Sequence, residues 1–217
     1  YVDSAMVRSK EVRLSQRVDQ IKRTKVSRLQ SGEPALYISS VFHDSAIVTD
    51  VLTFQNGRLT NLNSGGKLSY SVETLRNYYL YMEDIDDDGI MEMPSLMEIR
   101  PAPNQADAEP QQLVYWYAID SEGYEIQKAF TFHNVDGGWY LLLKMDALAV
   151  ERLAVAKESG GYTFYLWDET GTSAVALFSI YSFTGKDREK LATEQNRFPI
   201  YSGDNVIFAG KLEVGSG

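Results

Sequence analysis

Short apolar stretches rich in β-branched and aromatic residues recur along the first hundred residues of the chain. Some alternate with polar positions at a period of two and others are continuous, which is typical of β-strands. Asn56-Gly57 separates two of them, and this dipeptide favours a tight hairpin because both residues tolerate positive φ. We therefore predict strands over residues 35–40, 46–54, 58–62 and 78–82.

The second half of the chain continues the same pattern. Runs at 113–119, 126–133 and 139–145, joined by glycine-containing turns, predict an antiparallel meander. Asp146 is placed to cap a short helix that extends to about residue 153. Further strands are predicted at 162–167, 174–183 and 206–212, the middle one central in its sheet because it is almost continuously apolar. Residues 186–196 favour a short exposed helix or loop.

These elements predict a mainly β or α+β protein with antiparallel sheets and one or two short helices. Three of the six prolines fall between residues 101 and 112, a stretch with little apolar bulk that we interpret as a linker or a long surface connection. We accordingly expect two domains in the 217 residues, a propeller-blade-like region at 1–103 and an antiparallel-sheet domain at 104–217.

Charge is unevenly distributed. Residues 1–30 contain eight Lys and Arg against three acids, and the remainder contains 13 against 27, so +5 and −14 give the net charge of −9. Because apolar residues interleave the basic ones and aromatic stacking residues are nearly absent, the basic segment predicts an edge strand protected by charge and no binding of nucleic acid. The absence of cysteine excludes disulfides and thiolate metal sites without fixing a compartment.

The sequence Asp-Ile-Asp-Asp-Asp-Gly-Ile-Met-Glu at residues 84–92 has the spacing of a calcium loop. Alternate residues of a tight loop can direct Asp84, Asp86 and Asp88 at one cation, and Gly89 permits the sharp turn. We expect Ile90 to offer its backbone carbonyl while its side chain packs in the core, and Glu92 to complete the coordination directly or through water. Asp87 should point outward.

Two alternatives compete with this interpretation of the loop. An EF-hand requires a glutamate at its twelfth position, where this chain has Ser95, and no convincing helix follows. A solvated acidic turn needs no ion, since Asp and Gly are ordinary turn residues. Metal binding is favoured because the four carboxylates expected as ligands carry like charges that repel one another.

With its acid at the ninth position, the loop resembles the loops of FG-GAP/VCBS and integrin-type β-propeller blades. More broadly, the chain resembles a family of exported proteins and lipoproteins from Gram-positive gut bacteria, in which a propeller-like region precedes a second domain. The residues that carry this broader resemblance are Asp84 to Pro94, Trp116-Tyr117, Gly138 to Tyr140 and Leu177 to Tyr181. The resemblance implies Ca²⁺ ligation by Asp84, Asp86, Asp88, Ile90 and Glu92. The chain has room for one or two blades only.

Sequence motifs for catalysis are lacking. His43 and His133 fall in different predicted domains, and the motifs of P-loop, dinucleotide-binding, zinc-hydrolase and serine-hydrolase enzymes are missing. Paired carboxylates for glycoside hydrolysis, flanked by the aromatic clusters at 78–81, 115–117 and 139–140, stay open as an alternative function. We expect those aromatic residues to belong mainly to the core.

Taken together, the sequence predicts a non-enzymatic, calcium-stabilised binding or scaffold module. We expect it to act outside the cytoplasm, at the cell surface or secreted. Its expected partner is a protein or a glycan, and we expect contact with a membrane only through a lipid anchor outside this chain.

Overall fold

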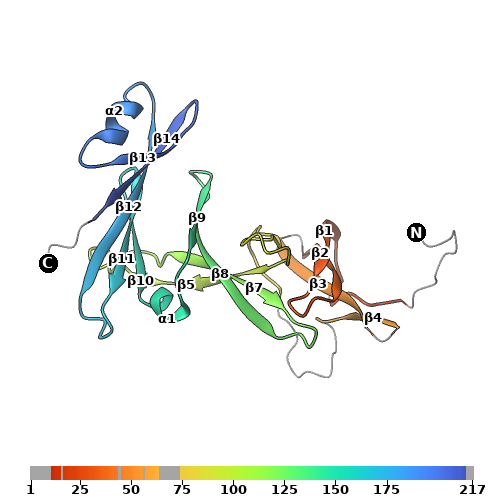
Figure 1. Cartoon of the computed structure of the whole chain (residues 1–217). Coiled ribbons are helices and arrows are strands. Elements are labelled where there is room, and N and C mark those ends of the chain that lie inside the picture. The colour runs from red at the N-terminus through yellow and green to blue at the C-terminus, as the bar shows by residue number, and fades with distance from the viewer. Residues whose placement is uncertain (1–10, 16, 44, 56, 64–73, 214–217) are drawn as a thin grey trace. The chain divides into compact units, whose positions relative to one another are not determined.

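The structure of the protein is a computed structural model, which describes residues 11–15, 17–43, 45–55, 57–63 and 74–213 (Figure 1). The described residues form a mainly β protein with antiparallel sheets and two short helices, as the sequence predicted. The chain divides into two compact units. Unit 1 comprises residues 1–96 and 114–131, and unit 2 comprises residues 97–113 and 132–217. The domain boundary expected at residue 103 falls within residues 97–113, a segment of unit 2 that separates the two segments of unit 1 in the sequence.

The first sheet of unit 1 follows the chain in the order β1-β2-β3-β4, with every neighbouring pair antiparallel. Its strands are β1 (Gln20–Arg28), β2 (Pro34–Phe42), β3 (Ala46–Gln55) and β4 (Arg58–Asn61). The predicted hairpin is confirmed by the pairing of Gln55 with Arg58 and by Gly57 at φ 73°; Asn56 itself lies outside the described residues. The basic strand β1 is largely exposed at the sheet edge, as expected.

A buried cluster joins this sheet to the segments on either side of the acidic loop. Tyr37 and Val51 contribute from the sheet. Met82 and Met93 flank the loop, and Met91 is its penultimate residue. Met82 and Met93 have no exposed surface and Met91 is 9% exposed. The acidic loop is therefore anchored at both of its ends in the core of unit 1.

A second sheet has the strand order β5-β7-β8-β9, which confirms the predicted meander. Its strands are β5 (Met93–Glu98), β7 (Gln112–Ile119), β8 (Glu125–Asn134) and β9 (Trp139–Leu143). Both β7 and β8 contain residues of the two units. Trp116 and Tyr117 are both buried although they face opposite sides of β7, so this part of the strand is covered on both faces.

Unit 2 is built on a six-stranded sheet of order β13-β14-β12-β11-β10-β6, in which β6 and β10 are the parallel pair. The strands are β6 (Arg100–Pro101), β10 (Leu153–Glu158), β11 (Gly161–Trp167), β12 (Ala174–Thr184), β13 (Phe198–Ser202) and β14 (Val206–Leu212). The interior position predicted for β12 is confirmed. Phe132 meets Tyr162 and Phe164 edge-on within the core.

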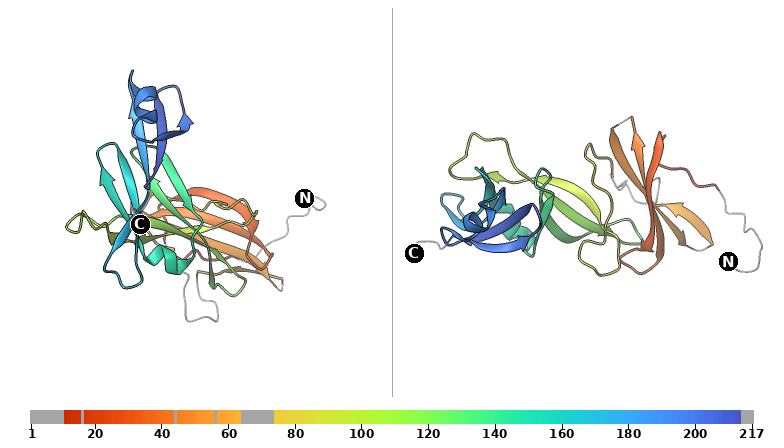
Figure 2. Two further views of the ribbon diagram at one scale, coloured as in Figure 1. Left: turned by 60° about the vertical axis from the view of Figure 1, so that its left-hand side comes forward. Right: turned by 90° about the horizontal axis from the view of Figure 1, so that it is seen from above.

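The two helices are short and belong to unit 2. Helix α1 (Ala147–Glu151) starts where predicted, because Asp146 Oδ1 accepts a hydrogen bond from the Ala149 amide at 2.7 Å. Helix α2 (Arg188–Thr193) packs Ala192 against Ile207 and Ala209 beside the hairpin of β13 and β14 (Figure 2).

Two secondary-structure predictions were wrong. Residues 78–82 form no strand. The Leu80 carbonyl accepts a hydrogen bond from the Arg76 side chain at 2.7 Å, in place of the backbone hydrogen bond that a neighbouring strand would supply. The predicted helix end at residue 153 is the start of β10, whose residues Leu153 to Ala156 are buried in the sheet. Burial there outweighs the helical propensity of its alanines.

Candidate metal centre

A short antiparallel bridge closes the acidic loop. The Glu83 amide donates to the Glu92 carbonyl at 3.1 Å, and the Glu92 amide donates back to the Glu83 carbonyl at 2.8 Å. Because the flanking methionines are buried in the core, this bridge fixes the two ends of the loop. The residues between Glu83 and Glu92 form a turn whose ends are held together by this bridge.

Two residues of the turn adopt the left-handed conformation, Asp87 at φ 61° and Gly89 at φ 83°. Gly89 takes it without steric cost, and Asp is among the side chains that tolerate it best. Asp84 holds the turn from inside: its Oδ1 accepts from the Asp88 amide at 3.0 Å and its Oδ2 from the Gly89 amide at 2.9 Å. Asp88 Oδ1 accepts from the Ile90 amide at 2.8 Å.

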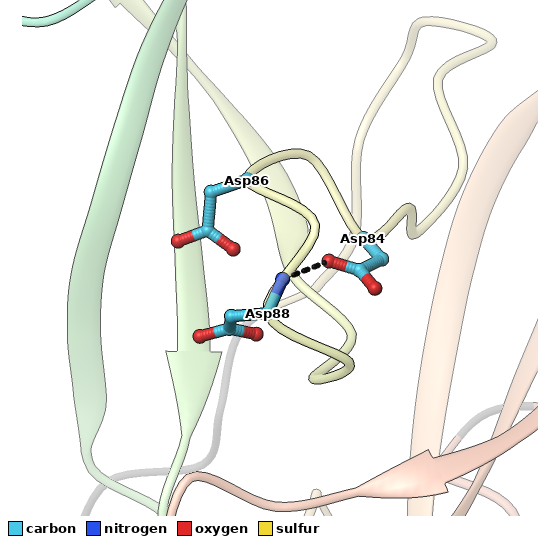
Figure 3. A group of neighbouring side chains, drawn as sticks. All are labelled: Asp84, Asp86 and Asp88. Carbon is cyan, nitrogen blue, oxygen red and sulfur yellow. Dashed lines mark hydrogen bonds between the residues drawn. The ribbon is translucent and has the colours of Figure 1, made fainter.

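This turn brings three of the predicted ligands together. Asp84, Asp86 and Asp88 each place a carboxylate oxygen within 4.8 Å of the others, an arrangement that could hold a metal ion (Figure 3). Asp87 is exposed, in agreement with its predicted outward position. Ile90 is half-buried, and it is the next residue, Met91, that joins the core cluster.

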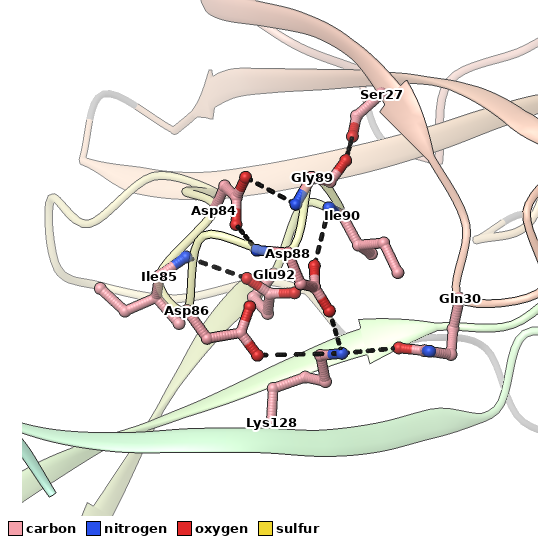
Figure 4. A network of polar contacts seen from close by, with 10 residues as sticks. All are labelled: Ser27, Gln30, Asp84, Ile85, Asp86, Asp88, Gly89, Ile90, Glu92 and Lys128. Atoms are coloured by element: carbon pink, nitrogen blue, oxygen red, sulfur yellow. Dashed lines mark hydrogen bonds and ion pairs between the residues drawn. The ribbon is translucent and has the colours of Figure 1, made fainter.

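Glu92, the predicted ligand at the ninth position, has no exposed surface. Its Oε2 accepts a hydrogen bond from the Ile85 amide at 3.0 Å, whereas its Oε1 has no hydrogen-bond partner in the part of the chain that the structure describes. Glu92 is not one of the three carboxylates that the turn brings together, although the negative charges of Asp86 and Asp88 act on it. Figure 4 shows its hydrogen bond to Ile85. A buried acceptor left without a donor costs about 1–3 kcal/mol, and more when it is charged.

Burial is the main reason that the pKa of Glu92 rises to about 7, and the negative charges of Asp86 and Asp88 add to the effect. The hydrogen bond from Ile85 acts in the opposite direction but is outweighed. Burial raises the pKa of Tyr37, and the negative charge of Glu92 adds to the effect. The Tyr37 hydroxyl donates to the Arg28 carbonyl at 3.2 Å. The loop thus contains a carboxyl group that is difficult to ionise without a cation beside it.

Lys128 on β8 supplies a positive charge to the cluster. Its Nζ contacts Asp88 Oδ2, lies 3.8 Å from Asp86 Oδ2 and donates to Gln30 Oε1 at 3.0 Å (Figure 4). Burial alone would raise the pKa of Asp88, but the lysine and the Ile90 amide outweigh it and the pKa is lowered. For Lys128, the charges of Asp88, Asp86 and Glu92 outweigh burial and raise its pKa.

The loop is also attached to the edge of the first sheet. The Ser27 hydroxyl on β1 donates to the Gly89 carbonyl at 3.1 Å. Sequence reasoning missed Ser27, Gln30 and Lys128, because each is distant from the loop in the chain and carries no local motif. For Lys128, the one sequence signal was its place in the alternating pattern of β8. Such a pattern does not identify the residues that a side chain contacts.

The two histidines belong to different units, and His133 contacts one of the aromatic residues. His43 is exposed in the turn after β2, and His133 on β8 stacks on Tyr140 with ring centroids 5.4 Å apart. The pKa of His133 is lowered by burial. Trp116 and Tyr117 belong to the core as expected, whereas Tyr79 and Tyr140 are exposed.

Comparisons with protein-family models, curated proteins and solved structures found no match to this chain. The resemblance of its loop to propeller-blade loops therefore stays a prediction. Neither helix in the described part of the chain is long and apolar enough to cross a membrane.

Proposed function

We propose that this chain is a non-enzymatic, Ca²⁺-stabilised binding or scaffold module that acts outside the cytoplasm. The observation that carries the proposal is Glu92, a fully buried carboxylate with one oxygen that has no partner among the described residues. The negative charges of Asp86 and Asp88, two members of the carboxylate cluster, act on it. A bound cation would supply the charge that this carboxylate lacks. The loop would then have a reason to gather four acids at one place.

The chemistry of the donors supports Ca²⁺ among the common ions. Every candidate ligand is an oxygen, from Asp84, Asp86, Asp88 and Glu92 and from the Ile90 carbonyl, whereas Zn²⁺ sites usually include histidine or cysteine. Mg²⁺ demands a near-ideal octahedron and keeps much of its water, while Ca²⁺ accepts six to eight oxygens in flexible geometry. A loop rich in carboxylates fits the less demanding ion.

The ion would act on stability. It would neutralise carboxylates in a turn whose two ends are held in the core by Met82 and Met91, so its binding energy would be added to the stability of unit 1. Extracellular calcium modules commonly bind at about 10⁻⁴–10⁻³ M, a range matched to calcium outside cells. The resemblance to exported proteins supports the same location, and exposed aromatic residues such as Tyr79 and Tyr140 could contact a protein or a glycan.

Isothermal titration calorimetry of the EDTA-treated and dialysed chain with CaCl₂ tests the proposal. We expect one site with a Kd of about 10⁻⁴–10⁻³ M and weaker binding of Mg²⁺. Asp86→Asn should weaken the binding at least tenfold, and Asp87→Asn, which removes the same charge from the neighbouring exposed residue, should leave it within about twofold. Absence of saturable Ca²⁺ binding up to about 10 mM would contradict the proposal.

A further inference from the structure

Lys128 lies against two of the three clustered carboxylates, those of Asp86 and Asp88. Its side chain, 13% exposed, reaches the acidic cluster from β8. The ammonium group contacts Asp88 Oδ2 and lies 3.8 Å from Asp86 Oδ2. A calcium loop of the usual kind does not need a lysine among its ligands, because the ion itself balances the carboxylates.

The oxygens that Lys128 contacts are those which the turn leaves available. Both oxygens of Asp84 and the Oδ1 of Asp88 already accept backbone amides that hold the turn together. The Oδ2 atoms of Asp86 and Asp88 face the ammonium group instead (Figure 4). A divalent cation that binds these same oxygens would lie close to the ammonium group, and the two positive charges would repel each other.

Lys128 leaves the cluster incompletely neutralised. One ammonium group faces the carboxylates of Asp86 and Asp88, and the buried Oε1 of Glu92 has no partner among the described residues. A divalent ion brings twice the charge and can be shared among more oxygens. The lysine is therefore only a partial substitute for a divalent ion, because it gives the Glu92 oxygen no partner.

We propose that Lys128 is a built-in competitor of the divalent cation: its ammonium group holds the Asp86 and Asp88 oxygens in the metal-free protein and is displaced when the ion binds. This inference rests on the proposed function, and it adds a regulator of the same site. By lowering the apparent affinity, Lys128 sets the Ca²⁺ concentration at which the loop is loaded. A weak site is useful where calcium is abundant.

A second partner makes the displacement feasible. Lys128 Nζ already donates to Gln30 Oε1 at 3.0 Å, and the Gln30 backbone amide is fixed by the Ile119 carbonyl at 2.9 Å. When the ammonium group leaves the carboxylates, it can keep this hydrogen bond. Its flexible four-carbon stem permits a shift of this kind without movement of β8.

Calorimetric titration with CaCl₂ of the wild-type chain, Lys128→Met and Lys144→Met tests the inference. Lys144→Met removes the same charge from an exposed residue of unit 2 and controls for net charge. Removing a positive charge from the cluster should tighten Ca²⁺ binding at least about tenfold, because charges a few ångströms apart interact strongly even when partly screened. Lys144→Met should bind as the wild type does, and Lys128→Arg, which keeps the charge, should stay weak.

The outcomes separate this inference from the proposed function. If the wild type binds Ca²⁺ and Lys128→Met binds it equally or more weakly, Lys128 is not a competitor, and the proposed calcium site is supported. No binding by either protein would overturn both. Tighter binding by Lys128→Met supports the competitor.

Thermal melts of the same variants distinguish a competitor from an ordinary structural ion pair. Lys128→Met should melt below the wild type in EDTA, since Asp86 and Asp88 lose their counter-charge, and should recover or exceed the wild-type midpoint in saturating Ca²⁺. An equal loss with and without Ca²⁺ would overturn the inference. Should Lys128→Met fail to fold in EDTA, Lys128→Gln, which retains a donor for Gln30, is measured in its place by the same criteria.

Discussion

Two acidic turns in this protein satisfy their carboxylates in different ways. In the turn of unit 2 that follows β11, Asp168 accepts hydrogen bonds from the hydroxyls of Thr170, Thr172 and Ser173 and from the backbone amides of Thr172 and Ser173. These bonds, led by that of the Ser173 hydroxyl, lower the pKa of Asp168. In the turn at 84–92, three of the five acids accept backbone amides, and one lysine reaches two of the acids.

The difference shows why acidic composition alone does not identify a metal site. Asp168 is one carboxylate surrounded by donors of its own turn, and it needs no cation. The loop at 84–92 has more carboxylate oxygens than hydrogen-bond donors. Lys128 contacts two of the acids from β8, and Glu92 Oε1 has no partner among the described residues. What distinguishes a candidate ion site is the charge that remains after the turn's own hydrogen bonds are made.

The largest expected effect is the pH dependence of the free energy of unfolding that Glu92 causes in the turn at 84–92. Its pKa rises from 4.5 to about 7 in the folded protein, so the folded state binds the proton more tightly than the unfolded state does. In EDTA, this contribution to the free energy of unfolding is complete below pH 4.5 and is lost as pH rises through 7, up to about 3 kcal/mol. Urea unfolding of the wild type and Glu92→Gln at pH 5 and pH 7.5 measures it.

Glu92→Gln cannot ionise, so its stability should fall less than that of the wild type over this interval. Saturating Ca²⁺ should reduce the wild-type loss, because the ion favours the ionised carboxylate. Identical pH dependence of the two proteins in EDTA would show that Glu92 is not the strained acid that the comparison requires.

A smaller effect separates neighbouring residues within the loop. Saturating Ca²⁺ should raise the melting midpoint of Asp87→Asn as much as that of the wild type, and should scarcely raise that of Asp86→Asn. The reason is that the Asp86 carboxylate belongs to the cluster, whereas Asp87 does not. Asp87 lies at φ 61°, a conformation that asparagine also tolerates. Differential scanning fluorimetry in EDTA and in Ca²⁺ is sufficient. Equal responses of the two variants would mean that the loop does not present its carboxylates as described.

The smallest effect concerns the self-sufficient turn. Asp168→Asn should lower the melting midpoint by the same small amount in EDTA and in Ca²⁺, because the ion has no role there. With its pKa lowered by hydrogen bonds, the ionised Asp168 adds stability above the ordinary aspartate pKa, and that stability is lost as pH falls below it. A Ca²⁺-dependent effect of Asp168→Asn would remove the contrast between the two turns.

Local signals predicted much of the fold. The hairpin at Gly57 and the cap at Asp146 appear where backbone conformation and side-chain acceptors require them. Residues 78–82 were misread because the Arg76 side chain, a near neighbour in the chain, bonds the Leu80 carbonyl. The helix end at 153 was misplaced because the sheet buries β10 from Leu153 onward. The interleaving of the two units through β7 and β8 has no local signature either.

In the candidate site too, local features were predicted and features that depend on tertiary packing were not. The spacing of the loop was enough to bring Asp84, Asp86 and Asp88 together, because a tight turn fixes the directions of alternate side chains. It could not reveal that Glu92 would be fully buried or that Lys128 would reach the cluster. Both facts depend on tertiary packing that joins segments far apart in the chain.

The most direct test of the calcium-stabilised module is a thermal melt of the wild-type chain in EDTA, in CaCl₂ at tenfold over its Kd, and in MgCl₂ at the same concentration. A ligand that binds only the folded state adds about 1.4 kcal/mol at that concentration, which predicts a rise of about 3–6 °C for a unit of this size. The account predicts this rise with Ca²⁺ and a smaller one with Mg²⁺. A midpoint that is unchanged by Ca²⁺ would contradict it and leave the loop as an acidic turn closed by Lys128.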